Sequence, residues 1–437
     1  MDLRRISCAM LTLLFSLAPI GANAGTAPAT GSLENEPALI SALRSRAVVL
    51  ESGAFSADDL NVAPIAQAAG NARIIGLGEG SHGTSEFYQI KDRVLRYLVE
   101  HQGFTVLAME GDWSEWTAVN RFVQTGDGTA ADVLRNQDYA MYRTVEMRNL
   151  IEWLRSYNAS VPSDRMVSVV GIDFQEPAKT FAIVADYVQR HSPGVAPTLA
   201  PARGCFVSTG NNGGPPLDTA EISACDLALS QVDADISQPT PAVNEYDKQL
   251  TRQAISILRR GEPMRLGASV QKRDHMMALN VEWLANTLHP NARIVVSTHD
   301  AHVCTCAPYW YIPMGSDLRK AFGTAYYSLG MLFGTGTVRA HPRAGNPSFI
   351  PIQLGQAPQT RVATLFDNIN ATFFLDVDAV PAHSPLGEWL GQPQSLWMPG
   401  GVIDPRNVKP YALGRLSLGR SFDGIVYVPT SHATSPL

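Results

Sequence analysis

Six residues of types that commonly carry out acid–base chemistry lie where apolar runs of the chain end. They are Glu79, His82, Glu110, Asp173, His299 and His302. Histidine titrates near neutral pH and can take a proton from water. A carboxylate bonded to the other ring nitrogen fixes the tautomer, and a second histidine or a lysine can stabilise an oxyanion. Together these residue types predict hydrolysis of an ester by activated water, without a covalent intermediate.

Nucleophilic catalysis by a side chain is less well supported. The chain contains no G-x-S-x-G segment, the turn that presents the serine nucleophile of α/β hydrolases. Ser81 directly precedes His82, but adjacent residues on a turn rarely reach each other with hydrogen-bond geometry. Cys304, two residues after His302, is a weaker candidate nucleophile.

Two other chemistries compete for the same residues. Gly78, Gly80 and Gly83 form a G-x-G-x-x-G between an apolar run and a helical pattern, as in dinucleotide-binding turns. Glu79 places an anion inside that turn, which disfavours a pyrophosphate there. Histidine and carboxylate ligands also suit zinc or manganese, although the chain has no H-E-x-x-H. A metal-dependent site therefore stays open as an alternative.

A strand–turn–helix unit positions the first of the candidate residues. Residues 74–77 form an apolar run bounded by glycines, typical of a parallel strand buried on both faces. A helix is predicted from Ser85, because Phe87, Ile90 and Val94 recur at helical spacing. Further buried strands are predicted at 104–109, 166–172 and 294–297. If these strands are parallel in one sheet, their polar ends meet at the edge where α/β folds carry their sites.

The rest of the chain alternates helical and strand patterns. Helices are predicted at 37–51, 114–123, 144–158, 177–189, 243–261 and 269–287, and further strands at 326–333, 372–375 and 424–428. Residues 191–220 are rich in Pro, Gly, Asn and Ser, which predicts a long loop or an insertion. The predicted fold class is α/β, with a central parallel sheet flanked by helices.

Composition limits the location and the partners of the protein. Residues 1–24 combine two arginines, a short apolar run and a final Ala-Asn-Ala, which predicts a secretory signal peptide. No other segment is apolar enough to span a membrane, so the mature chain, 25–437, is expected in the periplasm or secreted. A net charge of −6 without a basic run argues against nucleic acid or an anionic membrane surface as a partner.

Four cysteines lie outside the predicted signal peptide. Cys205 and Cys225 flank the glycine- and proline-rich segment, and export would permit a disulfide between them. Cys304 and Cys306 are separated by one residue, which fits a tight ring, two free thiols or half of a metal site.

Several motifs together resemble the erythromycin esterase family, the hydrolases of macrolide lactones and their relatives. They are GLGEGSHGTSEF with the helix after it, LAMEG at Glu110, VVGID at Asp173, RDHMMALN from Arg273, STHDAHV around His299, IPMGSDL around Gly315 and SFDGIVYVPT from Ser421. The motifs occur in collinear order over nearly the whole mature chain, and as a set they are specific.

The resemblance implies a role for each matching residue. His82 corresponds to the general base that activates water, and Glu79 to the essential acid beside it. Glu110 corresponds to a strand-end glutamate that orients a histidine. His299 corresponds to the second essential histidine, and His302 to its partner three residues later.

Four further residues are expected in supporting contacts. Lys91 stands nine residues after the first histidine, where the family has a basic residue; in place of arginine it would lose bidentate contact. Asp173 and Arg273 are expected to support the site. Asp300 stands where the esterases carry asparagine, and its charge would raise the basicity of His299 or alter the substrate preference.

The resemblance also implies a second, largely helical lobe, with the site in a cleft between this lobe and the α/β core. One hydrolytic domain is expected over 25–437, with an insertion at about 191–225. The expected function is an exported hydrolase of small-molecule carboxylic esters or lactones, with macrolide ring opening as one case and no cofactor. A distant likeness to metal-dependent proteases and a haem-binding lipoprotein leaves two alternatives: a divalent-metal hydrolase using the same cluster, and a non-catalytic protein that binds haem or another apolar ligand.

Overall fold

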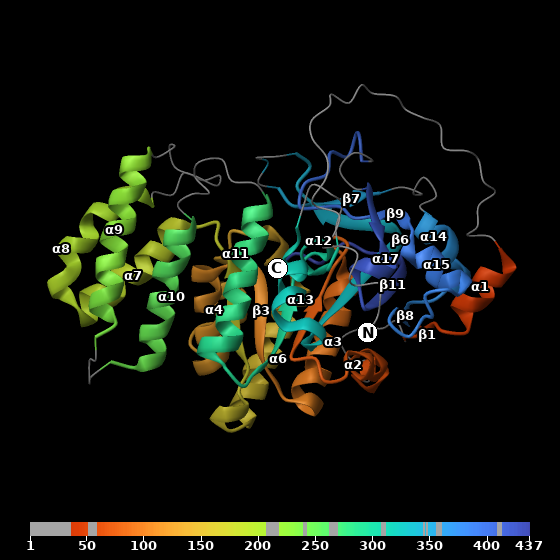
Figure 1. The fold of residues 1–437 in the computed structure, drawn as a ribbon, viewed down its shortest axis with the longest axis horizontal. Coiled ribbons are helices and arrows are strands. Elements are labelled where there is room, and N and C mark those ends of the chain that lie inside the picture. Colours follow the sequence, from red (N-terminus) through yellow and green to blue (C-terminus); the bar gives the residue numbers. More distant parts are fainter. Residues whose placement is uncertain are drawn as a thin grey trace.

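A computed structural model describes residues 36–50, 59–206, 218–238, 243–261, 270–306, 312–343, 346, 348–354, 361–408 and 413–437. The predicted signal peptide lies outside the described residues. Those residues form an α/β core with a group of helices at one end (Figure 1).

The core is a nine-stranded sheet in the order β1-β8-β11-β6-β2-β5-β3-β4, with β7 paired to β6. Its strands are β1 (Val48–Val49), β2 (Ile74–Leu77), β3 (Phe104–Asp112), β4 (Ser168–Asp173), β5 (Arg293–Ser297), β6 (Tyr326–Ala340), β7 (Ile350–Gln353), β8 (Phe373–Asp376) and β11 (Gly424–Ser431). The strands from β11 to β4 are parallel, whereas β1, β7 and β8 pair antiparallel. A separate pair consists of β9 (Pro393–Trp397) and β10 (Leu413–Ser417).

Helices connect these strands. They are α1 (Pro37–Arg44), α2 (Ala63–Ala69), α3 (Ser85–Gln102), α4 (Trp113–Thr125), α5 (Ala130–Arg135), α6 (Val145–Ser160), α7 (Pro177–His191), α8 (Ala196–Leu199), α9 (Thr219–Ile236), α10 (Glu245–Gly261), α11 (Val270–Trp283), α12 (Asp300–Val303), α13 (Met314–Phe322), α14 (Arg361–Phe366), α15 (Pro385–Gly391) and α17 (Leu418–Ser421). None of the described helices is long and apolar enough to cross a membrane.

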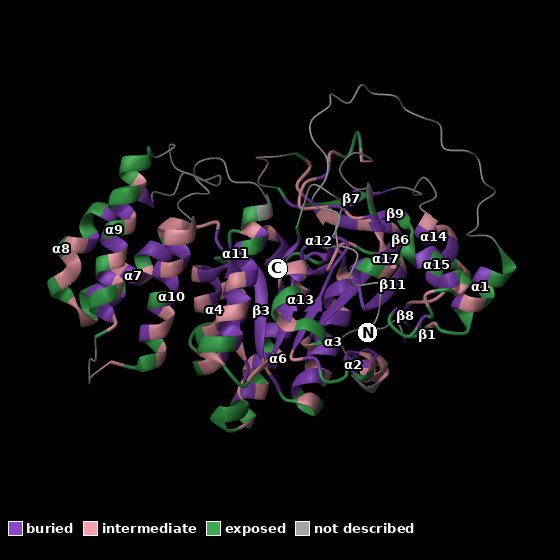
Figure 2. Cartoon of the chain, in the orientation of Figure 1, coloured by how far each residue is buried: buried purple, intermediate pink, exposed green. Residues whose placement is uncertain are grey.

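The four strands predicted to carry polar residues at their ends are confirmed as parallel neighbours in the sheet. Helices cover both faces of these strands. Ile75 and Leu77 of β2 belong to one buried apolar cluster with residues of α3 and α6, whereas Ile74 belongs to another with residues of α11 and α13. Burial on both faces explains why these strands are continuous apolar runs, and Figure 2 shows them as buried.

The helices α7 to α10 form the second lobe, at the left end of Figure 1. The disulfide considered between Cys205 and Cys225 is present and joins the helical turn Ala200–Cys205 to α9. An α/β core with a largely helical lobe is therefore confirmed.

Two segments differ from the sequence prediction. Pro193–Cys205 forms short helical turns instead of a loop, and each turn has a proline at its start, where the missing N–H is tolerated. Residues 207–217 lie outside the described part. The first helix ends at Arg44 rather than near 51, because Val48 and Val49 pair with β8.

Candidate active site

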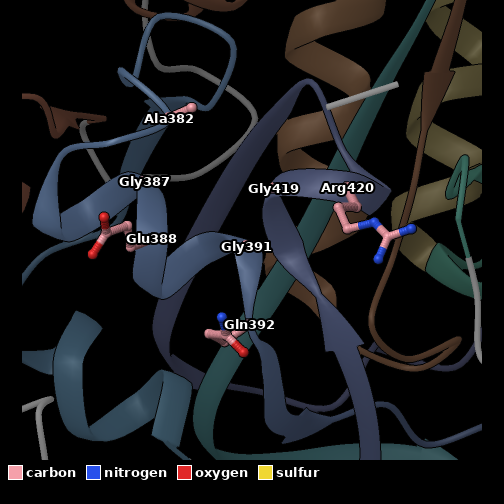
Figure 3. Close-up of a pocket in the computed structure, with 7 residues that line it drawn as sticks. All are labelled: Ala382, Gly387, Glu388, Gly391, Gln392, Gly419 and Arg420. Atoms are coloured by element: carbon pink, nitrogen blue, oxygen red, sulfur yellow. The ribbon is translucent and has the colours of Figure 1, made fainter. Parts of the chain in front are cut away.

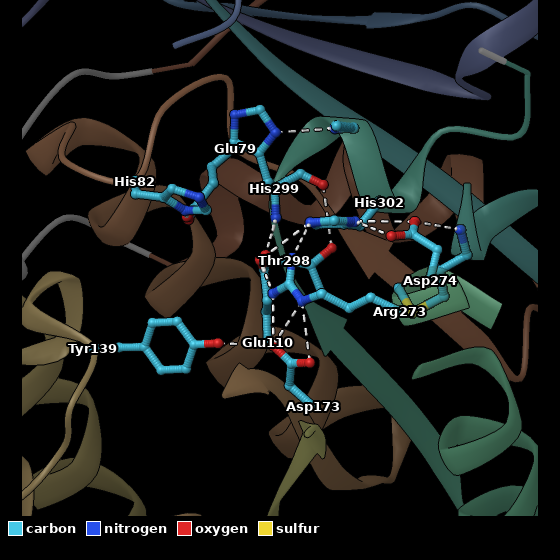
Figure 4. Close-up of polar contacts among 12 residues, drawn as sticks. Glu79, His82, Glu110, Tyr139, Asp173, Arg273, Asp274, Thr298, His299 and His302 are labelled. Atoms are coloured by element: carbon cyan, nitrogen blue, oxygen red, sulfur yellow. Dashed lines mark hydrogen bonds and ion pairs between the residues drawn. The ribbon is translucent and has the colours of Figure 1, made fainter. Parts of the chain in front are cut away.

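The carboxyl ends of β2, β3, β4 and β5 bring the predicted polar residues together (Figure 4). Glu79 and His82 follow β2, Glu110 lies near the end of β3, and Asp173 ends β4. His299 follows β5 and precedes α12. The remaining members are Lys91 from α3, Arg273 from α11, and Asp300 and His302 from α12. The convergence expected of a parallel sheet is therefore present.

His82 is paired with a buried carboxylate. Its Nδ1 lies 2.9 Å from Oε1 of Glu79, and Nζ of Lys91 donates to Oε2 of Glu79 over 2.6 Å. Burial acts to raise the pKa of Glu79, but Lys91 and His82 outweigh it and leave the pKa lowered, so Glu79 is ionised. A carboxylate facing Nδ1 holds the proton there, which leaves the lone pair on Nε2. The His82 side chain remains 12% exposed.

His299 lies beside His82, with the ring centroids 4.9 Å apart. Its Nδ1 accepts the main-chain N–H of Ala301 over 3.2 Å, as the N-cap of α12. Its Nε2 lies 3.3 Å from the carbonyl oxygen of Pro399 and must carry the proton, because a carbonyl only accepts. Burial and the nearby His82 lower the pKa of His299 to about 3, so the ring is neutral.

His302 is held in the opposite protonation state. Its Nδ1 lies 2.8 and 3.0 Å from the two oxygens of Asp274, and its Nε2 lies 3.2 Å from Oε1 of Glu110. Burial acts to lower the pKa of His302, but Glu110 and Asp274 raise it to about 10. Burial acts to raise the pKa of Glu110, but His302 and Arg273 hold it well below its usual range. The other oxygen of Glu110 accepts the main-chain N–H of His299 over 2.8 Å, so Glu110 links the two histidines.

Arg273 joins two carboxylates at the base of the cluster. Its Nη2 lies 2.6 Å from Oδ2 of Asp173 and 2.9 Å from Oε1 of Glu110. The hydroxyl of Tyr139 also donates to Oδ2 of Asp173, over 2.9 Å. Three cations of the described cluster therefore face carboxylates. They are Lys91, Arg273 and His302.

Asp300 does not raise the basicity of His299. Its Oδ1 accepts the main-chain N–H of Met331 over 3.0 Å, and the carboxyl is packed against Gly78. Burial raises the pKa of Asp300 well above its usual range, which favours the neutral acid. The predicted electrostatic effect on His299 is therefore wrong, because the charge that would exert it is suppressed by burial.

The glycine turn is used for close packing rather than for binding a phosphate. The N–H groups of Gly78 and Gly80 donate to main-chain carbonyls of β6, both over 2.8 Å. A Cβ at Gly83 would lie 2.1 Å from the carbonyl oxygen of Arg339. Because these N–H groups are already bonded, they cannot donate to the pyrophosphate of a dinucleotide, which argues against the dinucleotide interpretation.

Neither side-chain nucleophile considered from the sequence is presented to a substrate. The hydroxyl of Ser81 bonds to Thr84, and Sγ of Cys304 faces the carbonyl of Ala301 over 3.3 Å. Both Ser81 and Cys304 are buried, and burial raises the pKa of the Cys304 thiol well above its usual range. Cys304 is a free thiol, so the tight ring with Cys306 does not form.

The donor atoms of the cluster are directed at one another rather than at a common point. Within the described ranges, no group of three or more His, Cys, Asp or Glu side chains is arranged to hold a metal ion. Both ring nitrogens of His299 and of His302 have partners, and Glu79 is shared between His82 and Lys91. In this arrangement the donor set does not fit a metal ion.

Two members of the cluster were not predicted from the sequence. Asp274 directly follows Arg273, and this second acid next to a candidate arginine was the available signal. Tyr139 comes from the connection between α5 and α6, where nothing in the local pattern marks it.

A surface pocket of 380 Å³ opens elsewhere, beside α15 and α17 (Figure 3). It is lined by Ala382, Gly387, Glu388, Gly391, Gln392, Gly419 and Arg420. It contains no histidine and shares no residue with the cluster, so it is not the candidate active site.

A partly exposed histidine paired with a carboxylate, beside a neutral histidine at the strand ends of an α/β sheet, supplies a base and an N–H donor of the kinds that hydrolysis uses. The chain belongs to the erythromycin esterase family, whose sequence profile matches residues 99–431, and this membership places it among the ester hydrolases. The matched range includes Glu110, Asp173 and His299, but it begins after the turn that carries Glu79 and His82.

Individual proteins are similar to the chain in sequence or in fold. The chain is 25% identical to erythromycin esterase type II of Escherichia coli over 312 residues, which cover 63% of this chain and 73% of that protein. A crystal structure of a succinoglycan biosynthesis protein has a TM-score of 0.77 at 21% identity, covering 91% of this chain and 97% of that one. A mutant of the erythromycin esterase EreC in its open conformation has a TM-score of 0.65 at 18% identity, covering 87% and 96%. The two structural matches establish the shared fold.

Proposed function

We propose that the protein hydrolyses carboxylic esters or lactones, macrolide lactones among them, by direct attack of water. His82 is the general base, because Glu79 holds its Nδ1 and leaves Nε2 to take a proton. The neutral His299 donates its Nε2–H to the carbonyl oxygen on which negative charge develops. The family and the name of the Escherichia coli relative support a macrolide ester as substrate.

The observation that carries this proposal is the carbonyl oxygen of Pro399, 3.3 Å from Nε2 of His299. This N–H already bonds a carbonyl oxygen of the kind that an ester presents. The segment also lies near the base, since a Cβ at Gly401 would be 3.9 Å from Cδ2 of His82. A substrate that replaced the Pro399 carbonyl would have its own carbonyl carbon close to both histidines.

His82 both accepts and returns the proton that is transferred in the reaction. Water adds to the carbonyl carbon while one of its protons passes to Nε2 of His82, and the oxyanion faces His299. Glu79 stabilises the His82 imidazolium through its negative charge. The intermediate collapses by breaking the carbon–oxygen bond, and the departing alkoxide takes the proton from His82. A lactone thereby gains one water and opens to a hydroxy acid.

The charges of the site favour a neutral ester over a phosphate ester. Lys91 is paired with Glu79, and Arg273 is paired with both Glu110 and Asp173. A phosphate that drew on either cation would have to break a buried ion pair, which costs about 3–5 kcal/mol.

Mass spectrometry of purified protein with a macrolide lactone tests the proposal. We expect the substrate to gain one water with the wild type and not with His82→Ala, because removal of a general base lowers the rate by about 10²–10⁴. His275→Ala is the matched control, since His275 is exposed and pairs with Asp317 outside the cluster. Unchanged hydrolysis by His82→Ala would contradict the assigned base.

A chelator-treated sample separates the alternatives. Activity that survives the chelator supports the metal-free reaction, and activity that is lost and then restored by a divalent metal supports the metal-dependent hydrolase. Binding of haem or another apolar ligand, with no turnover of a panel of esters and lactones, would support the non-catalytic alternative.

We also propose that the chain is exported. Residues 1–24 have the features of a signal peptide. The disulfide between Cys205 and Cys225 supports an oxidising location, because such bonds persist mainly outside the cytosol.

A further inference from the structure

Asp274 holds His302 from the side opposite Glu110. Both oxygens of Asp274 lie within 3.0 Å of Nδ1 of His302. Oδ2 also accepts the main-chain N–H of Met314 over 2.8 Å, at the first residue of α13. The Asp274 side chain has no exposed surface. One buried carboxylate therefore ties α11 to both α12 and α13.

The other ring nitrogen of His302 continues this connection toward the proposed reacting groups. Nε2 lies 3.2 Å from Oε1 of Glu110, whose second oxygen accepts the main-chain N–H of His299 over 2.8 Å. Nη1 of Arg273 lies 3.3 Å from the same Nε2; with that nitrogen protonated, this is a close approach of two donors. Among the described residues, the titratable or charged groups around His302 include Glu110 of β3, Arg273 and Asp274 of α11, and His299 and Cys304 at the two ends of α12.

We propose that Asp274 is a positioning residue for the hydrolysis. By keeping His302 a cation whose Nε2–H faces Glu110, it fixes the carboxylate that holds His299 in place. The inference rests on the proposed function, because it assigns Asp274 to the positioning of the His299 donor. Asp274 acts through His302 and Glu110.

Removal of the Asp274 charge should act first on His302. In the wild type, Glu110 and Asp274 raise the pKa of His302 to about 10 against the effect of burial, so the cation persists at neutral pH. With a neutral amide at position 274, only Glu110 opposes burial, and the pKa of His302 falls. Above that lowered pKa the ring loses its charge, and its hold on Glu110 weakens. The loss of activity should therefore appear at alkaline pH and diminish as the pH falls.

Asp274→Asn, compared with Asp317→Asn, tests the inference. Asp317 of α13 pairs with His275 of α11 over 2.8 Å on the exposed side, so the control removes a carboxylate–histidine pair between the same two helices. Ester hydrolysis is measured between about pH 6 and pH 10. We expect kcat of Asp274→Asn to fall about tenfold or more at the alkaline end, with KM within about twofold of wild type. Asp317→Asn should follow the wild type. A loss by the same factor at every pH, or no loss, would overturn the inference.

An NMR titration of the His302 ring provides a readout that needs no substrate. We expect the ring to lose its proton at a lower pH in Asp274→Asn than in the wild type, where the pKa of His302 is raised to about 10. A His302 titration that is unchanged in the variant refutes the inference even where the wild type is active. If the wild type hydrolyses no ester, the proposed function fails separately. Asp274→Glu keeps the charge and replaces Asp274→Asn in the test if Asp274→Asn does not fold. A pH profile of hydrolysis like that of the wild type in Asp274→Glu supports the inference. A loss of hydrolysis at alkaline pH in Asp274→Glu contradicts it.

Discussion

His299 and His302 lie three residues apart, yet their neighbours hold them in opposite protonation states. Burial and a nearby imidazole lower the pKa of His299 to about 3, whereas two carboxylates raise that of His302 to about 10. His299 is therefore a neutral donor beside His82, whereas His302 is a cation held between Asp274 and Glu110. Residue type alone does not distinguish these states, because each is set by the charges that folding places nearby.

His299→Asn tests the donor assigned to the oxyanion. Asparagine is a good N-cap and can still accept the N–H of Ala301, so the start of α12 should be preserved. The variant lacks Nε2–H, and we expect kcat to fall by about 10²–10³ while KM changes little. Steady-state kinetics measure both constants, with His275→Ala as the control. A kcat within about tenfold of wild type would remove His299 from the oxyanion site.

Three aspartates of the cluster differ in how far the sequence predicts their role. Asp173 was predicted because it ends a recognisable strand. Asp274 lies within a helix, and its role depends on α12 and α13 meeting it in space. Asp300 has a charge in the sequence but is buried in the fold, and only the fold determines that burial.

At the scale of elements, the turn that carries His82 is held by two segments distant in sequence. The carbonyl of Gly83 accepts the main-chain N–H of Arg339 over 3.1 Å and that of Thr434 over 3.0 Å. The N–H of Ser85, at the start of α3, donates to the carbonyl of His432 over 2.8 Å. The turn therefore depends on β6 and on the segment after β11, as well as on its own glycines.

Gly83→Ala should disturb this arrangement specifically. A Cβ at Gly83 would lie 2.1 Å from the Arg339 carbonyl oxygen, so the turn or β6 must move. Overpacking of this kind costs about 1–3 kcal/mol of the free energy of unfolding. Misplacement of His82 by about 1 Å could lower the rate about 10²-fold. Denaturant unfolding and kinetics check the two effects. Gly194→Ala is the control, because its Cβ would meet no atom within 4 Å; equal behaviour of the two variants would contradict the prediction.

The elements that could be predicted are those whose pattern is local. The strands at β2 to β5 are apolar runs that helices cover on both faces, so the local apolar pattern identifies them. The short helical turns at Pro193–Cys205 could not be recognised, since proline at a helix start and proline in a loop look alike in sequence. The early end of α1 depends on pairing with β8, more than 300 residues away.

At the scale of the whole molecule, the lobe and the sheet share a continuous apolar core. One cluster of buried side chains includes Val106 of β3, Val184 of α7 and Val232 of α9. The same cluster contains both cysteines of the disulfide, Cys205 and Cys225. The disulfide therefore closes part of the lobe whose buried side chains share this cluster with the sheet that carries the histidines.

Protein isolated from the periplasm tests export and disulfide formation together. Mass spectrometry should find a chain that begins at Gly25, because the Ala-Asn-Ala before it fits a signal-peptidase site.

In denaturant without reductant, Cys205 and Cys225 should resist thiol labelling, whereas Cys304, free and buried in the fold, should react. Cys304 is thus an internal control that separates burial from oxidation. Loss of the bond in Cys205→Ser should lower the free energy of unfolding by roughly 3 kcal/mol, for a loop closed over 20 residues. A retained leader would contradict export, and labelling of both cysteines before reduction would contradict the disulfide in the exported protein.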